Sequence, residues 1–346
     1  MTGLARVLAV VAGLAVTEPA RAADDPSYTV LSFDELKGWE HDDHAAALDV
    51  FKETCPDMRD PDWLSLCALA TNQKNARTFF ELFFRPVLIE DGTPTLFTGY
   101  YEPELNGSRE RTDKYRYPLY RKPDELNGQL YYTRREIEED GVLDDKGLEI
   151  AWIDDPVDVF FLHIQGSGRV KFEDGSYLRV GYADKNGHDY RSVGQELVRR
   201  GIYTRHQVSA QVIRNWVKRN PEAGRKLLWH NPSFVFFREV SQVPPSRGPL
   251  GAMNRSITAM RSLAVDPDYV PLGAPVWIEK AGDTPMRRLM IAQDTGSAIK
   301  GAQRADIFFG TGDDAGIDAG KTRDPGRMVV LLPIQRAYAL APEGAG

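Results

Sequence analysis

Two carboxylates lie twelve residues apart around a glycine-rich loop in the stretch 292–310. Asp294 opens a D-T-G turn, and Asp306 begins an apolar run, I-F-F, at residues 307–309. Apolar surroundings disfavour the charged form of a carboxyl group and raise its pKa, so that the group can hold a proton near neutral pH. A general acid needs such a proton. The pattern therefore favours acid–base chemistry, although both aspartates also suit the simpler role of holding their own loop turns.

Three further motifs lie upstream of a third aspartate, Asp266, which precedes a proline. The pattern of Asp266, Asp294 and Asp306 closely resembles the three-aspartate (3D) domain of cell-wall-active proteins. The motifs T-G-Y-Y-E-P at 98–103, Y-P-L-Y at 117–120 and H-I-Q-G-S-G at 163–168 resemble those of the membrane-bound lytic murein transglycosylase A family. The resemblance runs from about residue 79 to 332, with the motifs in the family's order.

The resemblance implies a mainly β fold with N-terminal helices and two domains. Residues 23–105 and 237–335 would form a double-psi β-barrel that contains the 3D motif region, 255–332. Residues 106–236 would form an inserted, smaller, barrel-like β domain, and 336–346 a disordered tail. A deep groove would run between the two domains, where a long polymer is expected to bind.

The same resemblance implies a lytic transglycosylase that cleaves the β-1,4 bond between N-acetylmuramic acid and N-acetylglucosamine in peptidoglycan. Asp306 matches the family's catalytic aspartate, which acts first as acid and then as base. We assign Asp294 a supporting role near the acid, with a turn-holding role as the alternative. Asp266 is expected to form a turn. No cofactor and no metal are implied.

Candidate glycan contacts come from the same motifs. A tyrosine ring can lie against a sugar face, but adjacent strand residues point opposite ways, so one of Tyr100 and Tyr101 is expected to pack inside. The Gln165 amide offers both a donor and an acceptor. His163 is expected to be a core histidine rather than a base. The full set of candidate contacts is Thr98, Tyr100, Tyr101, Glu102, Gln165, Gly166, Ser167 and Lys300.

Three other functions compete with this one. The D-T-G triplet also carries the catalytic aspartate of aspartic proteases, but those enzymes need two such loops, and this chain has one. An expansin-like protein could bind glycan without cutting it. A conventional peptidoglycan hydrolase would use two carboxylates about 5 to 9.5 Å apart.

The N-terminus predicts export. Residues 1–22 carry Arg6, an apolar run at 7–16 and an A-R-A cleavage site, as in a secretory signal. The family's lipoproteins carry a lipid-accepting cysteine at this site, whereas the cysteines here are Cys55 and Cys67. We therefore expect a soluble periplasmic protein with a Cys55–Cys67 disulfide and no transmembrane anchor. Free thiols and a metal pair are the alternatives.

Charge narrows the class of partner. The net charge is −7, and lysines and arginines occur in no run longer than pairs. Phosphate backbones require a basic stripe, so a nucleic-acid partner is not expected. Peptidoglycan glycan strands are the expected ligand, and proteins of a wall-remodelling complex are possible partners.

Periodicity predicts helices over residues 34–85 and short strands after Val87. Leu130–Thr133 and Asp158–Ile164 are among the runs that favour strands. Capping patterns predict a helix after Ser192 and another after Thr204, the second ending at Pro221. Asp313 and Asp314 are expected to be loop charges.

Overall fold

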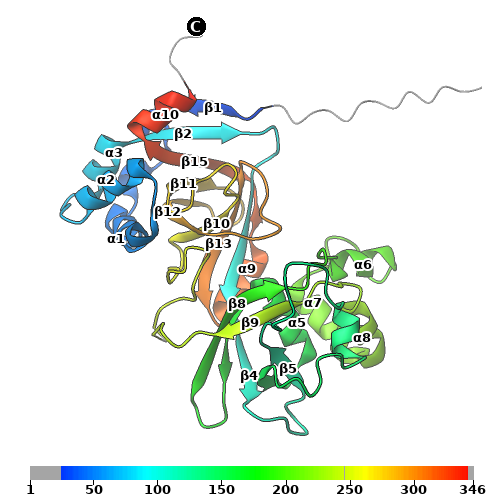
Figure 1. The fold of residues 1–346 in the computed structure, drawn as a ribbon. Helices are drawn as coiled ribbons and strands as arrows, with labels where there is room; N and C mark the ends of the chain where they lie inside the picture. The colour runs from blue at the N-terminus through cyan, green and yellow to red at the C-terminus, as the bar shows by residue number, and fades with distance from the viewer. Residues whose placement is uncertain (1–24, 245, 342–346) are drawn as a thin grey trace, which may run out of the picture.

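Two β-sheets organise the computed structural model, which describes residues 25–244 and 246–341 (Figure 1). The nine-stranded sheet has the order β1 (Ser27–Val30), β2 (Phe84–Glu90), β15 (Gly326–Pro333), β11 (Pro275–Lys280), β12 (Met286–Asp294), β10 (Ser262–Val265), β13 (Arg304–Thr311), β3 (Leu96–Glu102), β14 (Arg323–Asp324). The six-stranded sheet has the order β5 (Tyr117–Tyr120), β6 (Glu149–Ile153), β4 (Glu104–Ser108), β7 (Ser167–Lys171), β8 (Tyr177–Lys185), β9 (Val235–Glu239). The expectation of a mainly β chain with helices is confirmed.

The large sheet takes strands from both ends of the chain, and the small sheet takes its strands from the middle. The chain leaves the large sheet at Glu102 and enters the small sheet at Glu104, so a single residue, Pro103, separates β3 from β4. It returns through the segment between β9 and β10. The expected signal sequence, 1–22, lies outside the described residues.

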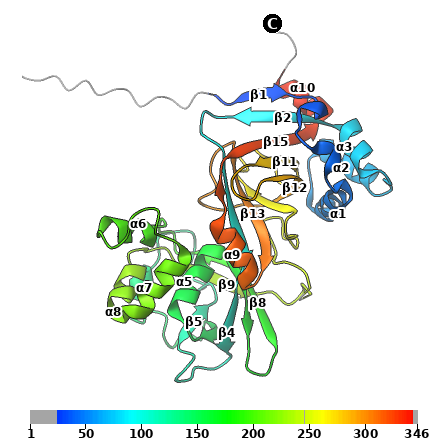
Figure 2. The same cartoon turned by 180° about the vertical axis from the view of Figure 1, so that it is seen from behind.

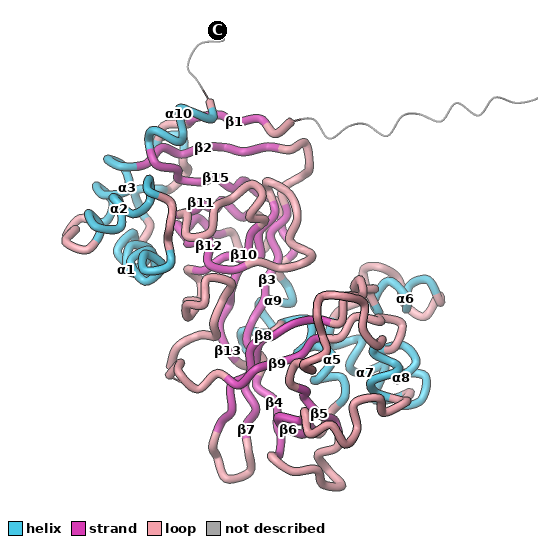
Figure 3. Tube along the Cα trace, in the orientation of Figure 1, coloured by secondary structure: helices cyan, strands magenta, loops and turns pink. Residues whose placement is uncertain are grey.

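The N-terminal helices flank the large sheet, as the cyan tubes of Figure 3 show. They confirm the helical prediction for 34–85 and are η1 (Phe33–Glu35), η2 (Trp39–His41), α1 (His44–Thr54), η3 (Cys55–Asp57), α2 (Pro61–Ala70) and α3 (Ala76–Phe83). Phe51, Phe79, Phe80 and Phe84 are each fully buried, and their rings contact one another across α1, α3 and β2. This apolar burial attaches the helices to the sheet.

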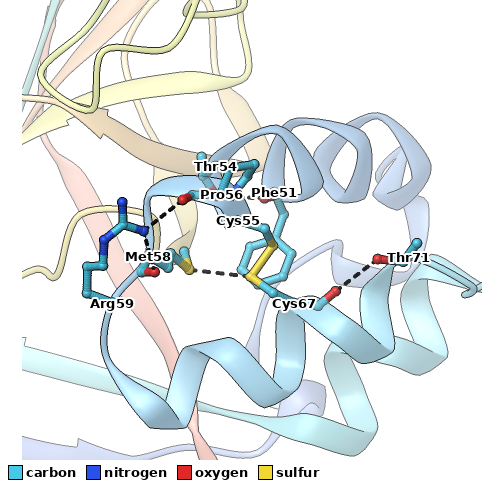
Figure 4. The surroundings of a disulfide bond; sticks show 8 residues. All are labelled: Phe51, Thr54, Cys55, Pro56, Met58, Arg59, Cys67 and Thr71. Atoms are coloured by element: carbon cyan, nitrogen blue, oxygen red, sulfur yellow. Dashed lines mark hydrogen bonds between the residues drawn. A yellow bond between two sulfur atoms is a disulfide. The ribbon is translucent and has the colours of Figure 1, made fainter.

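The predicted disulfide is confirmed. Cys55 and Cys67 are bonded, with their Cα atoms 5.5 Å apart, and the bond joins the end of α1 to α2 (Figure 4). Cys67 also lies against Met58, and the Thr71 hydroxyl donates to the Cys67 carbonyl. The disulfide therefore links two residues that lie twelve positions apart, within the helices that flank the large sheet.

Several local predictions are wrong. Residues 158–164 lie in a helix, α5 (Pro156–Gln165), because the Asp155 side chain caps the Val157 amide and Pro156 suits the first turn. Leu130–Thr133 forms no strand, and α4 (Arg134–Glu138) follows it.

The cap at Ser192 is confirmed for α6 (Val193–Arg199). The next helix, α7 (Ala210–Arg219), starts later than predicted because Ser209 caps it, whereas the Thr204 amide and hydroxyl only donate to Gln207 Oε1 across a turn. Pro221 does end α7, but it also starts α8 (Pro221–Leu228), since its ring fits the first position of a helix.

Two C-terminal helices replace predicted irregular structure. Asp313 and Asp314 form the first turn of α9 (Asp313–Lys321), where carboxylates favourably meet the helix dipole. Residues 336–340, expected in a disordered tail, belong to α10 (Ile334–Leu340), because Ala337 is fully buried against the large sheet. Figure 2 shows α9 lying over β13.

Candidate active site

A single transverse row of the large sheet brings the two candidate catalytic aspartates together. Asp294 on β12 and Asp306 on β13 both pair with Ala264 of β10, which lies between those strands. Thr98 of β3 pairs with Asp306 on the next strand. Neighbouring strands lie about 4.8 Å apart, so the Cα atoms of the two aspartates lie roughly 10 Å apart. Paired residues share a face of the sheet, so these side chains leave the sheet on the same side.

Asp306 accepts one hydrogen bond. The Thr98 hydroxyl donates to Asp306 Oδ1 at 2.5 Å, and Arg304 Nη2 donates to the same hydroxyl at 2.8 Å. Among the described residues, Asp306 Oδ2 has no hydrogen-bond partner. Burial raises the pKa of Asp306, although Thr98 and Arg304 oppose the rise. Asp306 therefore combines a tendency to hold a proton with one unengaged oxygen.

Asp294 is held by three donors. Its Oδ1 accepts from the Ala252 and Thr295 amides, each at 2.9 Å, and its Oδ2 accepts from the Tyr100 hydroxyl at 3.0 Å. Burial raises the pKa of Asp294 to about 6, against the effect of these donors, and the Asp306 charge adds a smaller increase. Both carboxyls thus have raised pKa values, but the hydrogen bonds distinguish them. Asp294 holds its own D-T-G turn and also fixes the loop that carries Ala252.

The two adjacent tyrosines separate as the strand alternation predicts. Tyr100 lies on the aspartate face, where burial raises the pKa of its hydroxyl well above the usual range and its ring lies 5.3 Å from that of Phe308. Tyr101 packs on the other face against α9, so closely that a Cβ on Gly316 would come within 2.8 Å of its ring. Tyr100 thus belongs to the site, and Tyr101 belongs to the packing.

The H-I-Q-G-S-G motif forms the junction between α5 and β7. Gln165 ends α5 and its Oε1 accepts from the Tyr101 amide at 3.2 Å, which connects the small sheet to β3. Gly166 follows with φ +77°, a conformation that favours glycine, and Ser167 begins β7. His163 is buried, lies 2.7 Å from Arg134 through Nδ1, and has a pKa well below its usual range because of burial. Its expected role in the core is confirmed.

The prediction that Glu102 binds sugar hydroxyls is wrong for this structure. Its side chain is fully buried and accepts from Arg169 Nε at 3.0 Å, Arg179 Nε at 2.7 Å and the Thr311 hydroxyl at 2.8 Å. Arg179 also donates to the Arg247 carbonyl in the returning segment, at 2.6 Å. Glu102 therefore joins β3 and β13 to β7, β8 and the returning segment.

Asp266 and Lys300 hold the loop that precedes β13. Burial favours a higher pKa for Asp266, but bonds from the Gly301 amide and Lys300 outweigh it, and the pKa is lowered. The expected turn-forming role of Asp266 is consistent with these contacts. Lys300 Nζ lies 3.0 Å from Asp266 Oδ1, so this side chain is engaged within the protein.

Sequence reasoning missed Arg304, which supports Thr98. The Q-R-A-D run carried the signal, because residues two apart on a strand share a face. In the described parts of the chain, no group of three or more His, Cys, Asp or Glu side chains is arranged to hold a metal ion. No described helix is long and apolar enough to cross a bilayer.

Comparisons with known proteins identify the family. The family model described as the MltA specific insert domain matches residues 96–238, and the 3D domain matches residues 261–332. A membrane-bound lytic murein transglycosylase A from Vibrio cholerae is 37% identical over 262 residues, covering 72% of this chain and 69% of its own length.

Solved structures show the same fold. A membrane-bound lytic murein transglycosylase from Agrobacterium tumefaciens is similar with a TM-score of 0.81 and 34% identity, over 91% of this chain and 99% of the other. Escherichia coli MltA with bound chitohexaose has a TM-score of 0.73 and 30% identity, over 88% of this chain and 94% of the other. The chain therefore belongs to the membrane-bound lytic murein transglycosylase A family.

Proposed function

We propose that this chain cleaves the β-1,4 bond between N-acetylmuramic acid and N-acetylglucosamine in peptidoglycan without water, leaving 1,6-anhydromuramic acid ends. The observation that carries the proposal is the contrast between Asp306, with one donor and one unengaged oxygen, and Asp294, with three donors. A group that exchanges a proton with a ligand needs an unengaged oxygen. Asp306 has one, and its raised pKa keeps the proton available.

The proton follows a closed cycle in this mechanism. The Asp306 carboxyl protonates the glycosidic oxygen as the bond from that oxygen to C1 of the muramic acid breaks. The hydroxyl on C6 of the same sugar then attacks C1, and its proton returns to Asp306. The nucleophile is already tethered to the reacting ring, so a second catalytic carboxylate is not required. Asp294 keeps Tyr100 and the loop at Ala252 in place beside the acid.

We also propose the domain organisation that this function uses. The large sheet would form the double-psi barrel, and its two parallel pairs, β10–β12 and β13–β3, are compatible with that topology. Residues 106–236 would form the inserted domain, and the glycan strand would lie in a groove between the two. We place the protein in the periplasm after removal of residues 1–22. The substrate contacts would include Thr98, Tyr100 and the Gln165–Ser167 junction.

Mass spectrometry of digests made in H₂¹⁸O tests the chemistry. Purified sacculi should give 1,6-anhydro ends without ¹⁸O at C1. A two-carboxylate hydrolase is the second candidate, because Asp294 lies in the same row as Asp306, with β10 between their strands, and has a pKa of about 6. That enzyme would give reducing ends labelled with ¹⁸O. Binding of glycan without turnover would instead support the expansin-like alternative.

A further inference from the structure

We propose that Tyr182, on the inserted domain, is a sugar-binding residue whose ring lies against a pyranose of the bound glycan strand. The inference rests on the proposed function and extends it to a residue outside the catalytic row, which is the row of Asp294, Ala264, Asp306 and Thr98 across the large sheet. Tyr182 is 48% exposed, which places its ring among the most exposed aromatic side chains of the described residues.

Strand alternation alone favours burial at position 182. Leu178 and Val180 lie on the same face of β8 and pack in the small-sheet core with Leu162 of α5. Tyr182 is the next residue of that series. Helix α5 ends at Gln165, and the chain turns away at Gly166. Helix α5 therefore covers Leu178 and Val180 but does not extend over Tyr182. The Tyr182 ring lies on the same face of β8, beyond the end of the helix.

The backbone at this position is also irregular. The register between β8 and β9 shifts between Tyr182 and Asp184, as in a β-bulge. Bulges re-aim side chains and are frequent beside functional sites. Among the described residues, the Tyr182 hydroxyl has no hydrogen-bond partner, so both ring and hydroxyl are available to a ligand.

Two short chains of contacts connect Tyr182 to the catalytic row. On one side, a Cβ at Gly166 would lie 3.9 Å from the Tyr182 Cβ, and the preceding Gln165 accepts from the Tyr101 amide on β3. On the other side, Arg238 donates to the Tyr182 carbonyl and to Asn254. Asn254 belongs to the loop whose Ala252 amide binds Asp294. Tyr182 thus lies beside the two segments that lead to the aspartates.

The ring has the chemistry for a sugar ligand rather than an ionic one. A tyrosine combines an apolar face with a polar edge, which suits the C–H face and the hydroxyls of a pyranose. The same strand provides a matched control. Tyr177 is 44% exposed on β8, but it pairs with Lys171 at the far end of the β7–β8 hairpin, away from α5 and β3.

The test compares Tyr182→Ala, Tyr182→Phe and Tyr177→Ala by calorimetric titration with chitohexaose and by turnover of sacculi. Tyr182→Ala should weaken chitohexaose binding by roughly three- to tenfold, the value expected for covering a half-exposed ring. KM for sacculi should rise with little change in kcat. Tyr182→Phe should retain most of the wild-type affinity, because the ring face makes the larger contact, and Tyr177→Ala should leave the wild-type constants unchanged.

The outcomes separate this inference from the proposed function. If wild-type protein neither binds chitohexaose nor cleaves sacculi, the proposed function fails. If wild-type protein does both and Tyr182→Ala behaves like Tyr177→Ala, the inference about Tyr182 is wrong. Loss of affinity accompanied by a lower melting temperature that Tyr182→Phe fails to restore would assign the residue a structural role and also overturn the proposal.

Discussion

Two carboxylate sites on neighbouring strands, the half-buried Asp306 on β13 and the fully buried Glu102 on β3, are built in opposite ways. Within the described parts of the chain, Asp306 has one donor and no direct ion pair, and its pKa is raised. Glu102 has two arginines and a hydroxyl, which engage both of its oxygens. A carboxylate with a structural role has hydrogen-bond partners on both oxygens. A carboxylate that transfers a proton must keep one oxygen without a partner. The hydrogen-bond partners of each carboxylate therefore separate the proposed acid from the domain junction.

The strongest test of this comparison is Asp306→Asn. The amide keeps the size of the side chain but cannot donate a carboxyl proton, so kcat on sacculi should fall by at least about 10²- to 10⁴-fold. Chitohexaose affinity should persist, because the change leaves the sheet intact. Initial rates and calorimetric titration measure the two effects. Near-normal turnover would contradict the assignment and move the acid to Asp294.

At the junction, Glu102→Gln should affect stability rather than chemistry. It removes the charge that compensates Arg169 and Arg179, and breaking a buried pair costs about 3–5 kcal/mol of the free energy of unfolding. Urea denaturation measures this loss. Glu104→Gln is the matched control, since Glu104 lies two residues away on β4 and is exposed. Equal stability of the two variants would show that the Glu102 ion pairs do not hold the junction.

Asp294→Asn should be milder than Asp306→Asn. An amide can still accept one or two of the three hydrogen bonds, so the loop at Ala252 loosens while the acid remains. We expect roughly a tenfold loss in kcat, less than general acid catalysis supplies. Steady-state kinetics of Asp294→Asn and Asp306→Asn, measured side by side, show which variant loses more of its kcat. A larger loss at Asp294 would favour the two-carboxylate hydrolase.

The smallest effect concerns pH. Because the acid must be protonated, activity should fall as pH rises through the raised pKa of Asp306. Thr98 opposes that rise, so Thr98→Val should raise the pKa of Asp306 further and move the alkaline limb of the kcat/KM profile to higher pH. Thr311→Val removes the corresponding hydroxyl from Glu102 and should leave the limb in place. A limb that stays fixed in Thr98→Val would mean that another group titrates there.

Much of this protein could be predicted from local sequence. The aspartates, the motif order and the family follow from short segments, and so does the expectation that Asp306 lies among apolar residues. Cys55 and Cys67 lie close enough in sequence for their bond to be predicted. Ser192 was identified as a cap because capping depends on residues three apart.

Tertiary structure decided what each side chain does. The Thr98–Asp306 bond joins residues 208 apart, and Ala264 brings Asp294 and Asp306 into one row only when β10 lies between their strands. Glu102 looked like a sugar contact because its motif places it beside two tyrosines, yet Arg169 and Arg179 from another sheet bury it. Residue type sets which bonds a side chain can form, but long-range strand pairing determines which partners lie within reach.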